Sequence, residues 1–237
     1  MKKYRQLFLD FDDTLYDTRG NAIISLKEVY DEMHLGDRLS SETLFYENYW
    51  RANTELWGLY GKGEIKRDYL IIERFRRPLA ETCDGPTDWI TDEYCLKVSD
   101  CFLDHCSVKP GVVEGAHELM QYLKSKGYGL HICSNGFHEV QFKKLRASGL
   151  HDYFDTIILS EDAGVNKPSP LFFDYALEKS GAERSETLMI GDNYNSDIIG
   201  AMNSGIDTLL FNRWGQTEFE KQPMYITDTL KEIMEIL

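Results

Sequence analysis

Short apolar runs of strand length alternate with helix-like segments in the C-terminal half of the chain, and this alternation constrains the fold most strongly. It is typical of parallel strands joined by helices that pack on the sheet. One further run of this kind stands alone near the N-terminus. We expect strands at Gln6–Leu9, Tyr128–Cys133, Thr156–Leu159, Thr187–Ile190 and Thr208–Phe211. The predicted fold class is α/β, with a doubly wound parallel sheet.

Two of the connecting helices are marked by apolar spacing and by residues typical of helix ends. The first is predicted from one apolar helix face, formed by Val112, Val113, Ala116, Leu119, Met120 and Leu123. Gly127 is a natural stop for it. The second is expected to start with Ser169 as its cap and Pro170 in its first turn, and to end at Gly181.

The stretch from residue 18 to residue 106 has a different character from the rest of the chain. Aromatic and charged residues alternate there at helical spacings, and β-branched runs are scarce. The strand and helix alternation resumes near Pro110–Gly111. We expect an all-α cap domain at 18–106, inserted after the first strand of a core that comprises residues 1–17 and 107–237.

Length, charge and cysteine content narrow the classes of function. A chain of 237 residues can bury a substantial core, and a formal net charge of −14 repels polyphosphate backbones. We expect a small anionic metabolite as partner and no nucleic-acid polymer. No apolar run reaches the roughly 20 residues that span a bilayer, so we expect no membrane partner and a cytoplasmic location. The five cysteines lack C-x-x-C spacing and are interpreted as reduced thiols.

Two carboxylates follow the first predicted strand. Asp10 and Asp12 stand at its carboxyl end, where open α/β sheets place their active sites. An acidic turn that only ends a strand would explain a D-x-D string equally well. A calcium loop would not, because Leu15 and Asn21 stand where its glycine and its glutamate belong.

Three further polar groups follow other predicted strands. Ser134-Asn135-Gly136 offers a hydroxyl and main-chain N–H groups that can hold phosphate oxygens. Lys167 offers an ammonium group that can neutralise developing charge. Asp192 and Asp197 supply carboxylates suited to Mg²⁺. Each group alone can be an ordinary turn or a solvated side chain, but four of them after four strands indicate one shared site.

In this order the motifs resemble those of the haloacid-dehalogenase-like (HAD) hydrolases, and the resemblance covers nearly the whole chain. It implies that Asp10 is the nucleophile and Asp12 the general acid and base. It assigns phosphate binding to Ser134 and charge neutralisation to Lys167. Many members also carry a helical cap after the first strand, where the insertion falls.

The resemblance further implies Mg²⁺-dependent hydrolysis of a phosphomonoester through an aspartyl-phosphate. Asp10, Asp192 and the main-chain carbonyl of Asp12 would hold the metal. Asp197 would hydrogen-bond to metal-bound water or to the lysine. Asp13 departs from the pattern, since many relatives have glycine there, and it adds negative charge close to the metal.

Part of the insertion also resembles the cap of bacterial nucleotidases that act on pyrimidine 5′-monophosphates. The stretch Asn53–Arg67 carries this likeness. It implies that Asn53 and Trp57 bind the substrate, which we expect to be a nucleotide. Leu56, Trp57 and Tyr60 can equally be cap core, because they are helically spaced.

Three alternatives stay open. A phosphatase of small sugar phosphates would need the same core motifs, and a phosphomutase would also keep both aspartates. A catalytically inactive ligand-binding or scaffold protein could share the fold, although retention of every expected catalytic side chain disfavours it. Dehalogenase chemistry is disfavoured by Asp12, since related dehalogenases lack the second aspartate.

Overall fold

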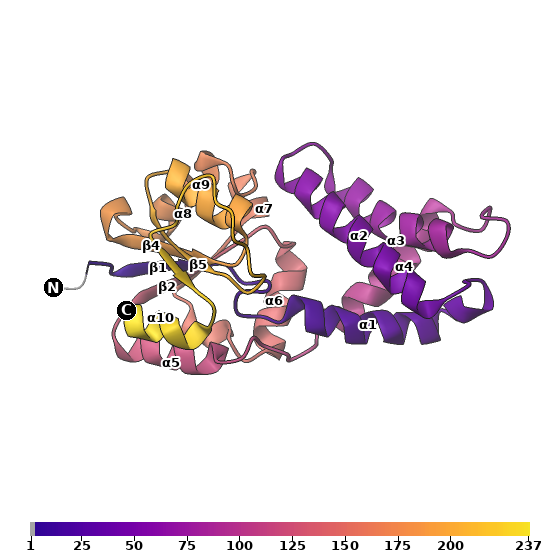
Figure 1. The fold of residues 1–237 in the computed structure, drawn as a ribbon, viewed down its shortest axis with the longest axis horizontal. Coiled ribbons are helices and arrows are strands. Elements are labelled where there is room, and N and C mark those ends of the chain that lie inside the picture. The colour runs from indigo at the N-terminus through magenta and orange to yellow at the C-terminus, as the bar shows by residue number, and fades with distance from the viewer. Residues whose placement is uncertain (1–2) are drawn as a thin grey trace. The chain divides into compact units, whose positions relative to one another are not determined.

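The computed structural model describes residues 3–237, and the chain divides into two compact units (Figure 1). One unit is formed by the N-terminal residues up to Thr18 together with Pro110–Leu237, and the other is Arg19–Lys109. The second unit starts one residue later and ends three residues later than the expected insertion.

The first unit is built on one six-stranded sheet in which every strand pair is parallel. The strands are β1 (Gln6–Leu9), β2 (Gly129–Ser134), β3 (Thr156–Leu159), β4 (Thr187–Gly191), β5 (Asp207–Phe211) and β6 (Tyr225–Thr227). Their order is β3-β2-β1-β4-β5-β6. The fold class and the five expected strands are confirmed to within one residue. The short β6 was not predicted, since three residues carry too little pattern.

Alternate side chains of β1 enter two separate cores, and this places helices on both faces of the sheet. Leu7 and Leu9 are fully buried against α5 (Ala116–Ser125) and α10 (Leu230–Ile236). Phe8 is fully buried against the helices of the opposite face. The connecting helices are α6 (His138–Ala147), α7 (Ser160–Ala163), α8 (Pro170–Ser180) and α9 (Ile199–Asn203), with a π-helical turn at Tyr194–Ile198 before α9.

Two details of the predicted helices need correction. The helix expected from Val112 begins only at Ala116, because Val112 pairs with Tyr16 in an antiparallel bridge that ties the returning chain to the segment after β1. Ser169 stands at the N-cap of α8 as expected, but its side chain makes no capping hydrogen bond. Gly181 ends that helix in a left-handed conformation, as predicted.

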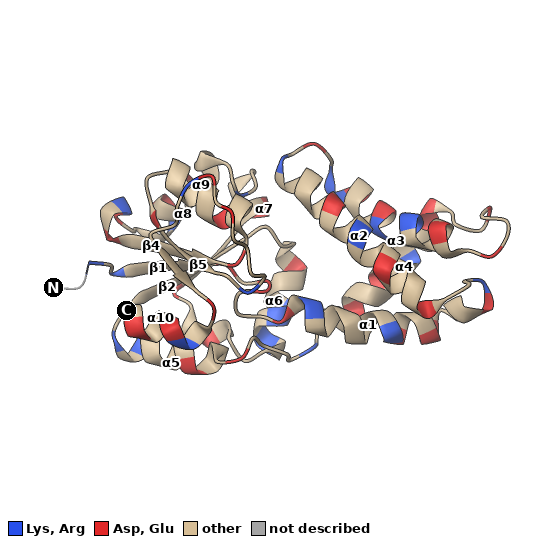
Figure 2. Cartoon of the chain, viewed as in Figure 1, with Lys and Arg blue, Asp and Glu red and all other residues tan. Residues whose placement is uncertain are grey.

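The second unit is all-helical, as expected. Its long helices are α1 (Thr18–Glu32), α2 (Glu42–Gly61), α3 (Arg67–Thr82) and α4 (Asp92–Cys106). They share an apolar core that includes Leu26, Phe45, Phe75 and Val98. Among residues 3–237, no helix has the length and apolar character needed to cross a membrane. Figure 2 shows Lys and Arg interspersed with Asp and Glu in both units.

Candidate active site

The strand register brings the ends of β1, β2 and β4 to one edge of the sheet. Leu9 pairs with Ile132 on one side and with Ile190 on the other. The residues that follow these strands are therefore neighbours. From β1 the chain adds β2 and β3 on one side of the sheet and then β4, β5 and β6 on the other side, so the topological switch point lies between β1 and β4. Open α/β sheets form their ligand sites at such a switch point.

Asp10 lies at the centre of this edge, and its side chain is 10% exposed. Its Oδ1 accepts a 2.7 Å hydrogen bond from Lys167 Nζ, and Thr14 Oγ1 lies 3.1 Å from its Oδ2. Burial, together with nearby carboxylates, raises the pKa of Asp10 well above its usual range, and the Lys167 ammonium opposes this. A cation at this edge would favour the ionised, nucleophilic form.

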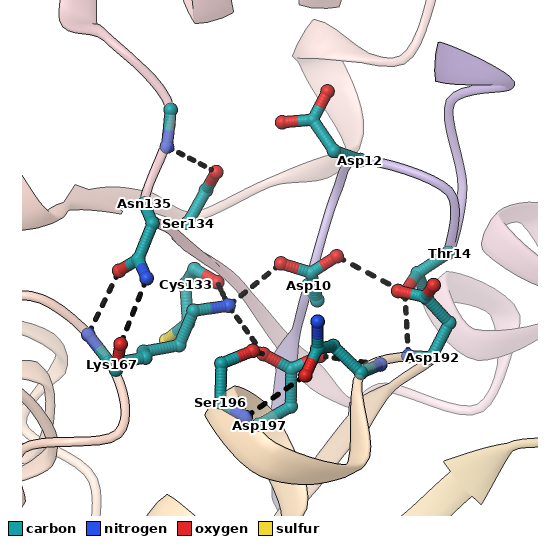
Figure 3. A network of polar contacts seen from close by, with 12 residues as sticks. Asp10, Asp12, Thr14, Cys133, Ser134, Asn135, Lys167, Asp192, Ser196 and Asp197 are labelled. Atoms are coloured by element: carbon teal, nitrogen blue, oxygen red, sulfur yellow. Dashed lines mark hydrogen bonds and ion pairs between the residues drawn. The ribbon is translucent and has the colours of Figure 1, made fainter. Parts of the chain in front are cut away.

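Lys167 compensates the charge of two carboxylates at once. Its Nζ donates to Asp10 Oδ1 and to Asp197 Oδ1, each at 2.7 Å, and to the Cys133 carbonyl at 2.6 Å (Figure 3). Burial alone would lower the pKa of Lys167, but the two carboxylates outweigh it and raise that pKa. The lysine is held as an ammonium. The Cys133 thiol is fully buried in the core, and burial raises its pKa.

Asp197 is fixed by the turn that carries it. Its Oδ2 accepts a 3.1 Å hydrogen bond from the Asn193 N–H, and Ser196 Oγ lies 3.0 Å from its Oδ1. Gly191 leaves room for this packing, because a Cβ there would stand 2.3 Å from Asp197 Oδ2. Gly191, directly before Asp192 in the sequence, is thus a steric requirement.

Asp192 is half-buried, whereas Asp10 and Asp197 are buried. Burial, and then the charge of Asp197, raises its pKa to about 7. Thr14 Oγ1 lies 3.1 Å from Asp192 Oδ1, and the indole N–H of Trp214 donates to Oδ2 at 2.7 Å. The side chain is therefore oriented by two neighbours, one of which comes from the segment after β5.

Carboxylate oxygens of Asp10, Asp192 and Asp197 lie within 4.8 Å of one another. An all-oxygen donor set at this spacing suits a hard cation such as Mg²⁺. Burial, and then the charges of neighbouring carboxylates, raises the pKa values of Asp10 and Asp192, and a cation bound among these oxygens would favour the ionised forms. The residues present fit a Mg²⁺ ion.

Asp13 adopts a left-handed backbone conformation with φ of 62°. Glycine adopts this conformation most easily, and aspartate is among the residues that tolerate it. Its carboxylate lies 3.2 Å from Arg213 Nη1, which also lies 3.3 Å from its carbonyl oxygen. The extra negative charge noted in the sequence is therefore partly compensated by Arg213.

The Ser134-Asn135-Gly136 turn is preorganised by hydrogen bonds. Ser134 Oγ accepts from the Gly136 N–H at 3.0 Å and from Gln141 Nε2 at 2.6 Å, which leaves its own proton available to donate. The Asn135 amide bonds the main chain of Lys167 on both sides, at 2.8 and 2.9 Å. A Cβ at Gly136 would stand 2.2 Å from Gln141 Nε2, so a larger residue there would displace the glutamine side chain from this network. The Asn135 side chain thus braces the lysine loop.

Asp12 lies at the same edge but is directed away from Asp10 (Figure 3). Its Oδ1 accepts hydrogen bonds from Thr18 Oγ1 and Lys144 Nζ, each at 2.6 Å, and its Oδ2 accepts one from Gln141 Nε2 at 2.5 Å. Burial would raise the pKa of Asp12, but the Lys144 ammonium and these hydrogen bonds outweigh it and leave the pKa lowered. In this arrangement the Asp12 side chain is held as a carboxylate.

Sequence reasoning missed several residues that order this site. Gln141 and Lys144 lie three residues apart on α6, so they share the helix face that meets Asp12. That spacing, directly after the Ser134 turn, is the signal that could have found them. Trp214 offers no comparable pattern.

The expected substrate residues Asn53 and Trp57 lie on α2 in the other unit, and both are partly exposed. Leu56 is fully buried in the core of that unit, so the packing interpretation holds for it. Trp57 and Tyr60 pack edge to face with ring centroids 5.5 Å apart.

Comparison with known proteins gives consistent results. The chain is 29% identical to pyrimidine 5′-nucleotidase YjjG of Escherichia coli, over 99% of this chain and 98% of the relative. It is 28% identical to a glyceraldehyde 3-phosphate phosphatase of Methanothermobacter thermautotrophicus, over 98% and 99%. A magnesium-bound crystal structure of YfnB, a provisionally assigned HAD-hydrolase of Bacillus subtilis, has a TM-score of 0.86, 28% identity and 99% coverage of both chains.

The family model for haloacid dehalogenase-like hydrolases matches residues 4–205. The match spans both units and all four polar groups of the sheet edge, in the order expected for the family. The chain belongs to the haloacid dehalogenase-like hydrolases.

Proposed function

We propose that this protein is a Mg²⁺-dependent phosphomonoester hydrolase that acts through an aspartyl-phosphate on Asp10. The observation that carries the proposal is the placement of Asp10. Its buried carboxylate touches the ammonium of Lys167 and lies within 4.8 Å of the oxygens of Asp192 and Asp197. A phosphate dianion repels a carboxylate nucleophile, so cationic neighbours are a prerequisite for attack.

Asp10, Asp192 and the main-chain carbonyl of Asp12 would hold the metal. Mg²⁺ bound there supplies positive charge that offsets the phosphoryl oxygens and the nucleophile. Asp197 contributes by holding Lys167 at 2.7 Å, in agreement with the expected role beside the lysine. Ser134, with two donors already on its oxygen, would turn its proton toward a phosphate oxygen.

Two displacements at phosphorus complete the proposed reaction. In the first, a carboxylate oxygen of Asp10 bonds to phosphorus while the ester P–O bond breaks, and Asp12 gives a proton to the departing alkoxide. In the second, water attacks the phosphorus and loses a proton to Asp12, which frees Asp10 and inorganic phosphate. Asp12 must leave Lys144 and Gln141 and take up a proton before it serves as the acid, because these partners favour its ionised form.

We further propose that the preferred substrate is a pyrimidine nucleoside 5′-monophosphate. The likeness to YjjG over nearly the whole chain supports this choice, as do the partly exposed rings of Trp57 and Tyr60. Stacking of a base on an aromatic ring contributes about 1–3 kcal/mol. That range corresponds to a preference of about 5- to 150-fold over a sugar phosphate.

A sugar-phosphate phosphatase is the second candidate, favoured by the comparable likeness to a glyceraldehyde 3-phosphate phosphatase. Values of kcat/KM for dUMP, dAMP, glucose 6-phosphate, phosphoglycolate and glyceraldehyde 3-phosphate separate the two. From about 1 kcal/mol of stacking, we expect kcat/KM for dUMP to exceed the values for the compounds without a base by fivefold or more. A preference for any of the last three would refute the nucleotidase assignment and leave the phosphatase chemistry standing.

The chemistry itself is tested with Asp10→Asn and with chelation. An amide of the same shape cannot form the acyl-phosphate, so the variant should fold and show no turnover. Activity that survives exhaustive chelation, or substantial turnover by Asp10→Asn, would overturn the covalent Mg²⁺ mechanism. Turnover of a simple aryl phosphate by the wild-type protein excludes an inactive scaffold, and turnover without a sugar bisphosphate excludes an obligate phosphomutase.

A further inference from the structure

A second cluster of metal-ligating side chains lies wholly within the Arg19–Lys109 unit. Glu28 and Glu32 are four residues apart on α1, and Cys101 and His105 are four residues apart on α4. Residues at this spacing share one helix face. The two pairs face each other, because His105 contacts both glutamates.

Three of these side chains converge at one point. His105 Nε2 lies 2.8 Å from Glu32 Oε2, and the Cys101 thiol hydrogen-bonds to Glu32. The sulfur, the imidazole nitrogen and the carboxylate oxygen lie within 4.8 Å of one another. A thiolate, an imidazole and a carboxylate form a donor set that Zn²⁺ accepts, whereas Mg²⁺ and Ca²⁺ prefer oxygen alone.

The other nitrogen of the same ring faces a second carboxylate. Glu28 Oε2 lies 3.2 Å from His105 Nδ1, and Glu28 Oε1 accepts a 2.6 Å hydrogen bond from Lys109 Nζ. Metal-bound histidines commonly donate their second N–H to a carboxylate, which fixes the tautomer and the ring orientation. The cluster contains this outer partner as well as the three ligands.

A plain surface network of hydrogen bonds is the competing explanation, and one observation counts against it. The buried Glu28 Oε2 accepts no hydrogen bond from any residue in the described part of the chain, although it lies 3.2 Å from His105 Nδ1. An ion bound to His105 Nε2 would leave the ring proton on Nδ1, the nitrogen that faces this oxygen.

We propose that Cys101 Sγ, His105 Nε2 and a carboxylate oxygen of Glu32 bind a Zn²⁺-like divalent ion, with Glu28 orienting His105. Binding forms a metal–sulfur bond and releases the thiol proton to solvent, without change of oxidation state. Water completes a tetrahedron, as is usual for zinc with three protein ligands. Because the ligands come from two helices, the ion cross-links α1 to α4.

Titration of the full-length protein with Co²⁺ in excess Mg²⁺ tests the proposal. Mg²⁺ competes for the carboxylates of the sheet edge, and those oxygens cannot produce thiolate-to-cobalt charge transfer. We expect a near-ultraviolet charge-transfer band that saturates at one Co²⁺ per chain and is displaced by Zn²⁺. Cys101→Ser should abolish the band, and the matched control Cys83→Ser, at a partly buried cysteine of the same unit, should keep it.

Glu28→Gln tests the orienting role, because that residue is no ligand. It should keep the band and weaken the apparent Co²⁺ affinity by about 10- to 100-fold. Absence of the band in the wild-type protein, or its persistence in Cys101→Ser, would overturn the site. An unchanged affinity in Glu28→Gln would overturn the role of Glu28. Far-ultraviolet circular dichroism verifies folding, and His105→Asn gives a second ligand variant if Cys101→Ser does not fold.

Discussion

Replacement of the Lys167 ammonium tests whether charge compensation holds the strand ends together. Lys167→Met keeps an unbranched side chain and removes the cation that contacts Asp10 and Asp197 at 2.7 Å. The lysine side chain is 2% exposed and the two carboxylates are 10% and 1% exposed, so water cannot replace it. Loss of one partner of a buried ion pair costs about 3–5 kcal/mol. We expect a loss of this size in the metal-free protein, together with loss of turnover.

Asp197→Asn is the matched variant for the same contact. Lys167 keeps Asp10 as a partner, and the removal of a negative charge beside Asp10 and Asp192 offsets part of the lost attraction. The expected cost is about 1 kcal/mol. The double variant leaves one fewer carboxylate without a cationic partner than Lys167→Met alone does. Its free energy of unfolding should therefore be about 1–3 kcal/mol higher than the sum of the two single changes predicts.

Hydrogen exchange of peptides that cover β1 and β4, measured with a chelator present, gives these free energies. The measurement is confined to the sheet, so unfolding of the 19–109 unit does not mix with it. A cost below about 1 kcal/mol for Lys167→Met would refute the reasoning, because removal of a needed buried charge partner costs several kcal/mol. Additive single and double variants would show that Lys167 and Asp197 are not coupled.

Three further predictions concern the same edge of the sheet. Asp12→Asn should still allow phosphorylation of Asp10 by a good leaving group but block hydrolysis of the phosphoenzyme; rapid-quench detection checks this, and unaltered steady-state turnover would contradict it. Trp214→Phe should raise the Mg²⁺ concentration for half-maximal activity by about 10- to 100-fold, since the indole N–H no longer orients Asp192, and an unchanged Mg²⁺ titration would argue against that role. Because burial and the charge of Asp197 raise the pKa of Asp192 to about 7, the folded metal-free protein binds this proton more tightly than the unfolded chain. Its stability should fall as the pH rises through about 7, and hydrogen exchange should show a smaller fall in Asp192→Asn.

Local sequence patterns were sufficient to predict five of the six strands and the sheet edge at which the candidate site residues meet. Apolar runs set the strands, and the residue after each run is placed by the strand itself. Because parallel strands present their carboxyl ends at one edge, Asp10, Ser134 and Asp192 had to become neighbours once the sheet formed. No long-range detail was needed for that prediction.

Tertiary structure alone decided which partners surround these residues. Asp12 meets Lys144, Asp192 meets Trp214, and these contacts depend on how each helix or loop packs against the sheet. Glu32 and His105 illustrate the same limit, since they lie on different helices, α1 and α4, and no local spacing in the sequence connects them. Glu32 reaches His105 across 73 positions of sequence, and only the packing of α1 on α4 brings the two side chains together.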